Sequence, residues 1–357
     1  MNLLTNLDAL LITDPTNIRY LTGFVGAAPE EREAYCLIAQ ESIYLFTSAL
    51  YLEQAKKTKA TVVEISRENP FAKKLGEILI GPRLGFEEND LMVAEYHKIM
   101  HAHKNVTLVP TKNRIEELRM MKRDDEIENI RKAAKITDEC FDYIQGNIKV
   151  EVTESDIAWE IETFIRTRGA SLAFSPIVAF GKNTSQPHYN SSNKQQETRD
   201  RLKQNDIILL DFGARIEGYC SDMTRMVFVG KPEDEWKRAY NTVFDAQHAA
   251  LEYLHLEGVK AHLPGGASAD RIARRVIEKA GFPTYPHSLG HGVGLAIHEQ
   301  PRLSYKKIMK LRPGMVITVE PGIYVEGSYG IRIEDLVLLK KDGIEILTTS
   351  PKELTIL

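Results

Sequence analysis

Five residues with metal-binding side chains stand in five short motifs of this sequence: Asp211, Asp222, His291, Glu320 and Glu334. Four carboxylates gathered in one place would repel one another and raise their own pKa values. A pair of divalent cations removes that penalty, because each cation compensates the charge of several acids. The set therefore predicts a two-metal site, and a two-metal site is typical of hydrolysis.

The first two acids flank a predicted hairpin. Asp211 ends the apolar run 206–211, and Asp222 lies on a return strand after a turn near Ile216–Gly218. This pairing places the two carboxylates opposite or nearly opposite each other, with Cβ atoms roughly 5 Å apart. Like charges that face each other across a ladder destabilise it, and a bridging cation would reverse the sign of that interaction.

The last two acids repeat this design. Glu320 ends an apolar strand, and a turn centred on Gly327 places it opposite Glu334. Arg332 precedes Glu334 by two residues, so both side chains point to one face. Surface carboxylates on hairpins are common and usually stay apart. The strands that end at Asp211 and Glu320 are too apolar for the surface, however, and buried carboxylates need partners. We therefore expect two similar halves that enclose one site.

Four histidines stand near these motifs. His287 and His291 lie in a glycine-rich stretch, His298 follows it, and His188 stands after an apparent strand and loop. The glycines let the backbone approach a ligand closely, but their spacing is not that of a phosphate-binding loop. A single histidine is usually structural, whereas several around one set of candidate ligands indicate function.

Four strings of this sequence resemble one family: LDFGARIEGYCSDMTR, HSLGHGVGLAIHEQP, TVEPGIY and GIRIEDLVLL. They are similar to motifs of the Xaa-Pro peptidases, aminopeptidase P and prolidase, which share the pita-bread fold of methionine aminopeptidase. The resemblance covers the whole chain and is strongest from about residue 113 onward, while Asp14–Phe24 resembles the family's creatinase-like N-terminal domain. It implies an α+β catalytic domain with a pseudo-twofold antiparallel sheet, preceded by a smaller α/β domain.

The resemblance also implies a role for each candidate residue. Two metal ions would be held by the five residues named first, with Asp222 and Glu334 as the bridging ligands. Glu320 would in addition orient or deprotonate the attacking water. The remaining roles are stabilisation of the tetrahedral intermediate by His298, contact with the scissile peptide by His188, and a proline pocket framed by His287, Arg332 and Tyr324. The stretch Asn190–Asn205 is several residues longer than is usual in the family.

The predicted activity is hydrolysis of the Xaa-Pro bond at the N-terminus of a peptide. Carboxylate oxygens with one imidazole suit Mn²⁺, and Co²⁺ or Zn²⁺ is also compatible with them. We favour an Xaa-Pro aminopeptidase, with an Xaa-Pro dipeptidase (prolidase) as the alternative. Remoter alternatives on the same fold are a creatinase-type hydrolase and a non-catalytic binding module. The loop Ala27–Glu33 could reach over a site or form a solvated turn.

Two domains are expected to position these residues. Residues 1–112 alternate strands and helices, and the polar segment 111–114 marks a boundary, so the catalytic domain is 113–357. In the first domain we expect strands at Asp8–Thr13, Tyr35–Ala39, Ser42–Phe46 and Ala60–Ile65 and helices at Leu50–Lys57 and Pro70–Ile80.

The second domain is expected to begin with a long helix, Asp124–Ile144, and a capping box at Thr153–Asp156 opens the next helix. Further helices are predicted at Glu235–Leu256 and Ser268–Ala280. Strands are predicted at Ile177–Ala179, Ile207–Phe212, Thr224–Val229, Val316–Val319 and Ile331–Leu339.

Composition narrows the setting of the activity. Of 357 residues, 43% are hydrophobic and 27% charged, with a net charge of -4, so neither a nucleic acid nor a membrane is expected as a partner. The N-terminus does not resemble a signal peptide. Three widely spaced cysteines suit a reducing cytoplasm. Proline-containing peptides are the expected substrates, and the family resemblance implies a homodimer.

Overall fold

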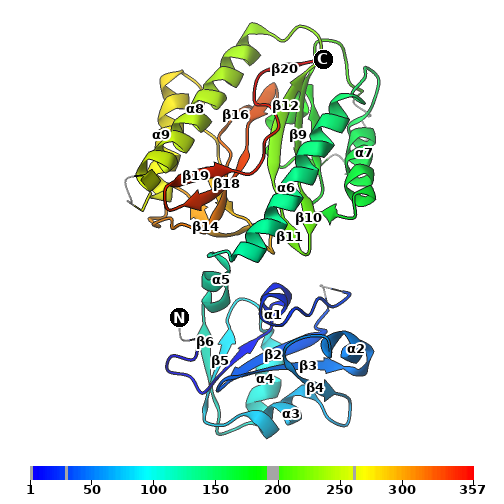
Figure 1. Ribbon diagram of the computed structural model, residues 1–357, viewed down its shortest axis with the longest axis vertical. Helices are drawn as coiled ribbons and strands as arrows, with labels where there is room; N and C mark the ends of the chain where they lie inside the picture. The colour runs from blue at the N-terminus through cyan, green and yellow to red at the C-terminus, as the bar shows by residue number, and fades with distance from the viewer. Residues whose placement is uncertain (1–2, 29–30, 191–200, 260–262) are drawn as a thin grey trace. The chain divides into compact units, whose positions relative to one another are not determined.

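The chain divides between Arg119 and Met120 into two units, each with its own core (Figure 1). The computed structural model describes residues 3–28, 31–190, 201–259 and 263–357. Residues 29–30 of the predicted loop Ala27–Glu33, and residues 191–200 of the long stretch Asn190–Asn205, lie outside the described residues.

A six-stranded mixed sheet in the order β4-β3-β2-β1-β5-β6 is the centre of the first unit. Its strands are β1 (Ala9–Ile12), β2 (Ala34–Ala39), β3 (Ser42–Ser48), β4 (Thr61–Ile65), β5 (Arg83–Glu87) and β6 (Thr107–Thr111). Its helices are α1 (Pro15–Thr22), η1 (Ala49–Tyr51), α2 (Leu52–Ala55), α3 (Phe71–Ile78), α4 (Val93–Ala102) and α5 (Arg114–Arg119). The antiparallel pair β2–β3 matches the predicted strand pair. The helix expected at Leu50–Lys57 is shorter in the structure. Tertiary packing supplies most of the stability of a helix, and α2 buries only the side chain of Ala55.

Helix α5 belongs to the first unit, so this unit ends seven residues after the boundary expected at 112/113. The Arg119 guanidinium donates to Asn17 Oδ1, and Asn17 Nδ2 donates to Glu116 Oε1. Ile115 is fully buried in the core of this unit. The described part of the loop 27–33 is also held within the unit, since Glu33 accepts hydrogen bonds from the Ala27 and Ala28 amides.

Four helices flank the strands of the second unit. They are α6 (Asp124–Gln145), α7 (Glu154–Thr167), α8 (Asp234–Val259) and α9 (Gly266–Lys279). Figure 1 shows α8 and α9 on one side of the strands and α6 and α7 on the other. Thr153 caps α7 as predicted, because its hydroxyl accepts from the Asp156 amide while the Asp156 carboxylate accepts from the Thr153 amide. Every described helix is too short or too polar to cross a membrane.

The strands of the second unit form mostly antiparallel sheets. A four-stranded sheet has the order β20-β12-β9-β8, and a five-stranded sheet has the order β14-β13-β15-β18-β19. A β16–β17 hairpin and a three-stranded sheet β11-β10-β7 complete the unit. The bounds are β7 (Ser171–Leu172), β8 (Ile177–Phe180), β9 (Ile207–Phe212), β10 (Ala214–Ile216), β11 (Tyr219–Cys220), β12 (Met223–Phe228), β13 (Gly290–Gly292), β14 (Glu299–Leu303), β15 (Val316–Val319), β16 (Gly322–Val325), β17 (Tyr329–Arg332), β18 (Asp335–Lys340), β19 (Gly343–Ile346) and β20 (Thr355–Ile356).

Strand β9 is buried on both faces. Ile208 and Leu210 pack with residues of α6 and α7, while Ile207 and Leu209 pack with residues of α8 and α9. Successive side chains alternate between the faces of a strand, so this strand contributes to two layers of core. An acid at its end is therefore enclosed by protein.

The register of the two hairpins refines the sequence prediction. In the first hairpin Asp211 lies opposite Thr224, so Asp222 is offset from it by two positions and points to the same face. In the second, the single strand expected at Ile331–Leu339 is divided into β17 and β18. The ladders on both sides, Val319↔Asp335 and Gly322↔Arg332, share one register that brings Glu320 opposite Glu334.

Removing the Phe141 ring from α6 should destabilise the second unit. Phe141 is fully buried against β9 and α7, so Phe141→Ala should lower the free energy of unfolding by about 3–5 kcal/mol. Urea denaturation followed by circular dichroism measures this loss. Trp159→Ala on α7 is the control, because a side chain that is 66% exposed should contribute within about 0.5 kcal/mol. An equal loss in both variants would contradict this assignment of the core.

Candidate metal centre

All predicted site residues except Tyr324 line one cavity of about 140 Å³ in the second unit. Tyr324 lies behind the wall and contacts two of the lining residues. The structure therefore brings together residues that are up to 146 positions apart in the sequence, from His188 to Glu334. The predicted residues that line the cavity are His188, Asp211, Asp222, His287, His291, His298, Glu320, Arg332 and Glu334.

Most of the acids lie at positions where a strand is interrupted or has not yet begun. Asp211 lies within β9, but Asp222 precedes β12, Glu320 lies between β15 and β16, and Glu334 lies between β17 and β18. His291 is in β13, where the register shifts between His291 and the next residue. Such irregularities are a common means of aiming a side chain into a site.

The side chain of His291 lies close to two of the acids. Its Nε2 lies 3.3 Å from Glu320 Oε1 and 3.7 Å from Asp222 Oδ2. Its Nδ1 is 3.1 Å from the Gly292 carbonyl oxygen, which can only accept, so the ring proton belongs on Nδ1. Burial lowers the pKa of His291 to about 3, so the ring is neutral. Nε2 therefore presents a lone pair to the acids, as a metal-binding imidazole does.

Three of the five predicted ligands form a tight group. Asp222, His291 and Glu334 each offer a ligand atom, and these atoms lie within 4.8 Å of one another. Asp211 and Glu320 are not part of this group of three but line the same cavity. A cluster of this spacing and composition could hold a divalent cation.

Electrostatic strain within the acid cluster is severe. Burial, followed by repulsion from Glu334, raises the pKa of Asp222 well above its usual range. Burial and the neighbouring acids Glu320 and Asp211 do the same to Glu334. Burial also raises the pKa of Glu320 to about 7. Bound cations would favour the ionised forms of all these groups.

Asp211 has a cationic partner on one oxygen only. Arg332 Nη2 donates to Asp211 Oδ2 and opposes the rise in the pKa of this acid that burial causes. The other oxygen, Oδ1, is buried and has no hydrogen-bond partner among the described residues. A buried oxygen of this kind is costly unless it binds a ligand. The donor set and this unpartnered oxygen both fit a bound metal ion.

A hydrogen-bonded chain leads away from the acids through His287, Tyr324 and Arg332. His287 Nδ1 lies 2.8 Å from the Ser288 carbonyl oxygen, and burial lowers the pKa of His287 to about 3. Nε2 of the neutral ring therefore accepts from the Tyr324 hydroxyl, at 3.0 Å. The same hydroxyl accepts from Arg332 Nη1 at 2.9 Å. This chain fixes the wall of the cavity.

His298 and His188 are both exposed at the cavity. The His298 ring is 4.5 Å from the His291 ring, nearly perpendicular to it. Burial lowers the pKa of His298 as well, so this ring is neutral near pH 7. The segment that carries His188 is held on one side, because the Pro187 carbonyl oxygen accepts from Arg332 Nη1.

Six lining residues of the cavity were not among the predicted site residues, and two of them, Pro187 and Ser288, adjoin predicted histidines in the sequence. Phe174, Ile177 and Ile297 supply an apolar wall, and Arg302 supplies an exposed guanidinium. Arg302 pairs with His291 across the β13–β14 ladder, and its charge acts on His298 and Glu320. The position of Arg302 four residues after His298 could have indicated that it belongs to the site. The sequence does not distinguish the three apolar residues from residues of the core.

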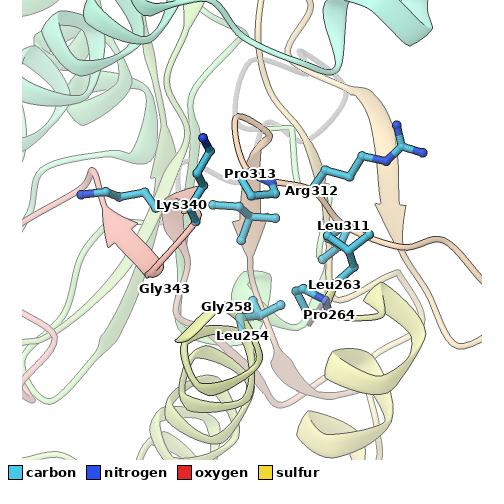
Figure 2. Close-up of a pocket in the computed structure, with 11 residues that line it drawn as sticks. Leu254, Gly258, Leu263, Pro264, Leu311, Arg312, Pro313, Lys340 and Gly343 are labelled. Atoms are coloured by element: carbon cyan, nitrogen blue, oxygen red, sulfur yellow. The ribbon is translucent and has the colours of Figure 1, made fainter. Parts of the chain in front are cut away.

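A second, larger cavity of about 270 Å³ lies around Leu339 and Lys340, near the end of β18 that is remote from Glu334 (Figure 2). The residues that line it include Leu254, Leu311 and Pro313, and none of the lining residues is an acid, histidine or cysteine. In Figure 2 the guanidinium of Arg312 points away from the cavity. This cavity therefore lacks the side chains that usually bind a metal ion.

Comparisons with known proteins agree with this geometry. Residues 128–341 match the model of metallopeptidase family M24, and residues 5–121 match the creatinase/prolidase N-terminal domain. An uncharacterized peptidase of Bacillus subtilis is 38% identical over 98% of this chain and 96% of its own length.

Two solved structures are similar over nearly the whole chain. The Xaa-Pro dipeptidase from Bacillus anthracis is 37% identical, with a TM-score of 0.89 over 99% of this chain and 96% of that one. The X-Pro aminopeptidase from Thermotoga maritima is 34% identical, with a TM-score of 0.87 over 99% of both chains.

The acid cluster should make the metal-free protein less stable as the pH rises. The pKa of Glu320 is raised in the folded state to about 7 from 4.5, so its contribution is present below pH 4.5 and is lost as the pH rises through 7. Differential scanning calorimetry in chelator should show a falling melting temperature between pH 5 and pH 8. The fall should be smaller with Mn²⁺ or in Glu320→Gln. A fall that Glu320→Gln leaves unchanged would contradict this origin.

Proposed function

Since the chain belongs to metallopeptidase family M24, we propose that it uses two divalent cations to hydrolyse the peptide bond before proline. That the protein is a metallo-exopeptidase follows from the family match and from its structural neighbours. The specificity, the ligand set and the metal are our proposal. The proposed ligands are Asp211, Asp222, His291, Glu320 and Glu334.

The observation that carries this proposal is the convergence of five candidate ligands on one buried site with an unpartnered carboxylate oxygen. Asp222, His291 and Glu334 present ligand atoms within 4.8 Å of one another. Oδ1 of Asp211 lacks a hydrogen-bond partner among the described residues. Four carboxylates and one imidazole favour Mn²⁺, with Co²⁺ or Zn²⁺ as alternatives. When bound, two such ions lower the pKa of a shared water and polarise the scissile carbonyl.

The chain's own residues would then handle the protons. Glu320, a buried carboxylate that lines the cavity, would accept a proton from the attacking water and pass it to the leaving nitrogen. Neutral His298 can donate a hydrogen bond to the oxygen that gains charge. His188, which lines the cavity, would contact the scissile peptide.

Specificity for proline is supported by the wall of the cavity. Phe174, Ile177 and Ile297 offer an apolar surface on which a pyrrolidine ring can pack. The chain of His287, Tyr324 and Arg332 holds the opposite polar side. The nitrogen of an Xaa-Pro bond carries no hydrogen. A site that offers no hydrogen-bond acceptor to this nitrogen therefore binds a proline substrate without losing a hydrogen bond.

For the length of the substrate we favour dipeptides, because of Arg302. Its exposed guanidinium lines the cavity, and a guanidinium matches the free carboxylate that a dipeptide presents next to its scissile bond. Of the two structures compared, the Xaa-Pro dipeptidase is also slightly more similar. The Xaa-Pro aminopeptidase favoured by the sequence is the second candidate, supported by the X-Pro aminopeptidase from Thermotoga maritima.

We retain a homodimer and a cytoplasmic location as parts of the proposal. The three cysteines are buried and are not joined in disulfides, which is compatible with a reducing compartment. Light scattering of the purified protein would test the dimer, which rests on the family resemblance alone.

Neutralising a bridging carboxylate should abolish turnover. Glu334→Gln or Asp222→Asn should lower kcat/KM for Xaa-Pro substrates by more than about 100-fold, because loss of a ligand exceeds the usual effect of an outer contact. Elemental analysis should find about two metal ions per wild-type chain and fewer in the variants. Glu326→Gln, in the exposed β16–β17 turn, is the matched control. Full activity of the metal-free wild type would contradict the proposal.

Substrate length can be tested through Arg302. The wild type should hydrolyse Ala-Pro faster than Ala-Pro-Ala, and Arg302→Ala should lower kcat/KM for Ala-Pro roughly 10- to 100-fold, the usual contribution of a charged hydrogen bond. Ala-prolinamide, which lacks the carboxylate, should be nearly unaffected by the substitution. Faster turnover of Ala-Pro-Ala by the wild type would favour the aminopeptidase instead.

A further inference from the structure

Two buried threonines lie against two of the proposed metal ligands. Thr224 is in β12 and Thr318 is in β15, so each half of the second unit supplies one. Both are fully buried. Each hydroxyl bonds to a carboxylate of the site and to one other group of the site.

Thr224 contacts three residues of the site: Asp211, Arg332 and Glu334. Its hydroxyl donates to Glu334 Oε2 at 2.7 Å and accepts from Arg332 Nε at 3.0 Å. Its backbone lies opposite Asp211 in the β9–β12 ladder, and its carbonyl oxygen accepts from the Glu334 amide. Thr224 thus holds the backbone and the carboxylate of Glu334 from one position.

Thr318 has the same arrangement in the other half. Its hydroxyl donates to Glu320 Oε1 at 3.1 Å and accepts from the His291 amide at 3.1 Å. This contact depends on Gly290, because a Cβ there would lie 1.9 Å from the Thr318 carbonyl oxygen. A glycine at this position lets β13 approach β15 closely enough for the amide of one ligand to reach the hydroxyl that holds another.

With both carboxylates ionised, as bound cations would hold them, chemistry fixes the direction of all four hydrogen bonds. An ionised carboxylate can only accept, and an amide or guanidinium N–H can only donate. Each threonine hydroxyl therefore donates its single proton to a carboxylate and accepts a hydrogen bond from the N–H group. Neither hydroxyl can turn to another partner without leaving a buried charged group unpaired, which costs more than the bond itself.

We propose that Thr224 and Thr318 are positioning residues of the metal centre, which orient Glu334 and Glu320 before metal binds. This inference rests on the proposed function, because the two carboxylates are ligands only if the site holds metal. Groups that orient metal ligands typically contribute 10- to 100-fold in metal affinity. The threonines should therefore affect metal binding itself, whether or not substrate is present.

Isothermal titration of the metal-free full-length chain with Mn²⁺ tests the proposal. Thr224→Val keeps the shape of the side chain but removes the hydroxyl, and should raise the Kd roughly 10- to 100-fold. Thr224→Ser restores the hydroxyl and should return the Kd to within about threefold of the wild type. The pair Thr318→Val and Thr318→Ser repeats the test independently should a Thr224 variant fail to fold.

Thr242→Val is the matched control. Thr242 is a buried threonine of α8 whose hydroxyl bonds to the Arg238 carbonyl oxygen, so its loss should leave the Kd unchanged. If both valine variants bind Mn²⁺ as tightly as the wild type, or if the serine variants bind as weakly as the valine variants, the positioning role is wrong while the proposed function stands. If the wild type itself binds no divalent cation, both are wrong.

Discussion

The repulsion among four enclosed carboxylates is the constraint around which the second unit is organised. Burial and mutual repulsion raise the pKa values of Asp222 and Glu334 well above their usual range, and a structure that gathers such groups needs compensating charge. Arg332 donates a hydrogen bond to Asp211, and its charge also opposes the rise in the pKa values of the other three acids. His291 is kept neutral by burial. Among the described residues that line the cavity, Arg332 and Arg302 are the permanent cations, so two positive charges face four carboxylates and the site is built for cations from solution.

Strand interruptions reconcile this charge with an apolar core. The ladders on both sides of Glu334 have one register, yet β17 and β18 are separate strands. The backbone between these two strands is therefore available for contacts outside the ladder. The Glu334 carbonyl oxygen, for example, accepts a hydrogen bond from the Arg225 guanidinium. Arg225 is itself paired with buried Asp335 at 2.7 Å. The ligand is thus held through its backbone as well as its carboxylate.

Much of this arrangement could be read from the sequence, because the signals were local. Apolar runs that end in acids located β9 and β15, and turn residues located both hairpins. The offset of Asp222 from Asp211 could not be read, since a shift of two residues preserves the face and leaves the hydrophobic pattern unchanged. Nor could Thr224 be singled out, because a threonine within a strand is ordinary and its three contacts come from distant segments.

The cavity separates the chemistry from the recognition of substrate. The acids and His291 are the buried part of the lining, where burial and charge determine protonation, and their chemistry does not depend on the side chains next to the amide bond. Phe174, Ile297 and Arg302 lie on the lining without contributing to the acid cluster. A relative on the same fold could therefore change the peptides that it accepts by altering one apolar side chain of the lining, without disturbing the balance of charge.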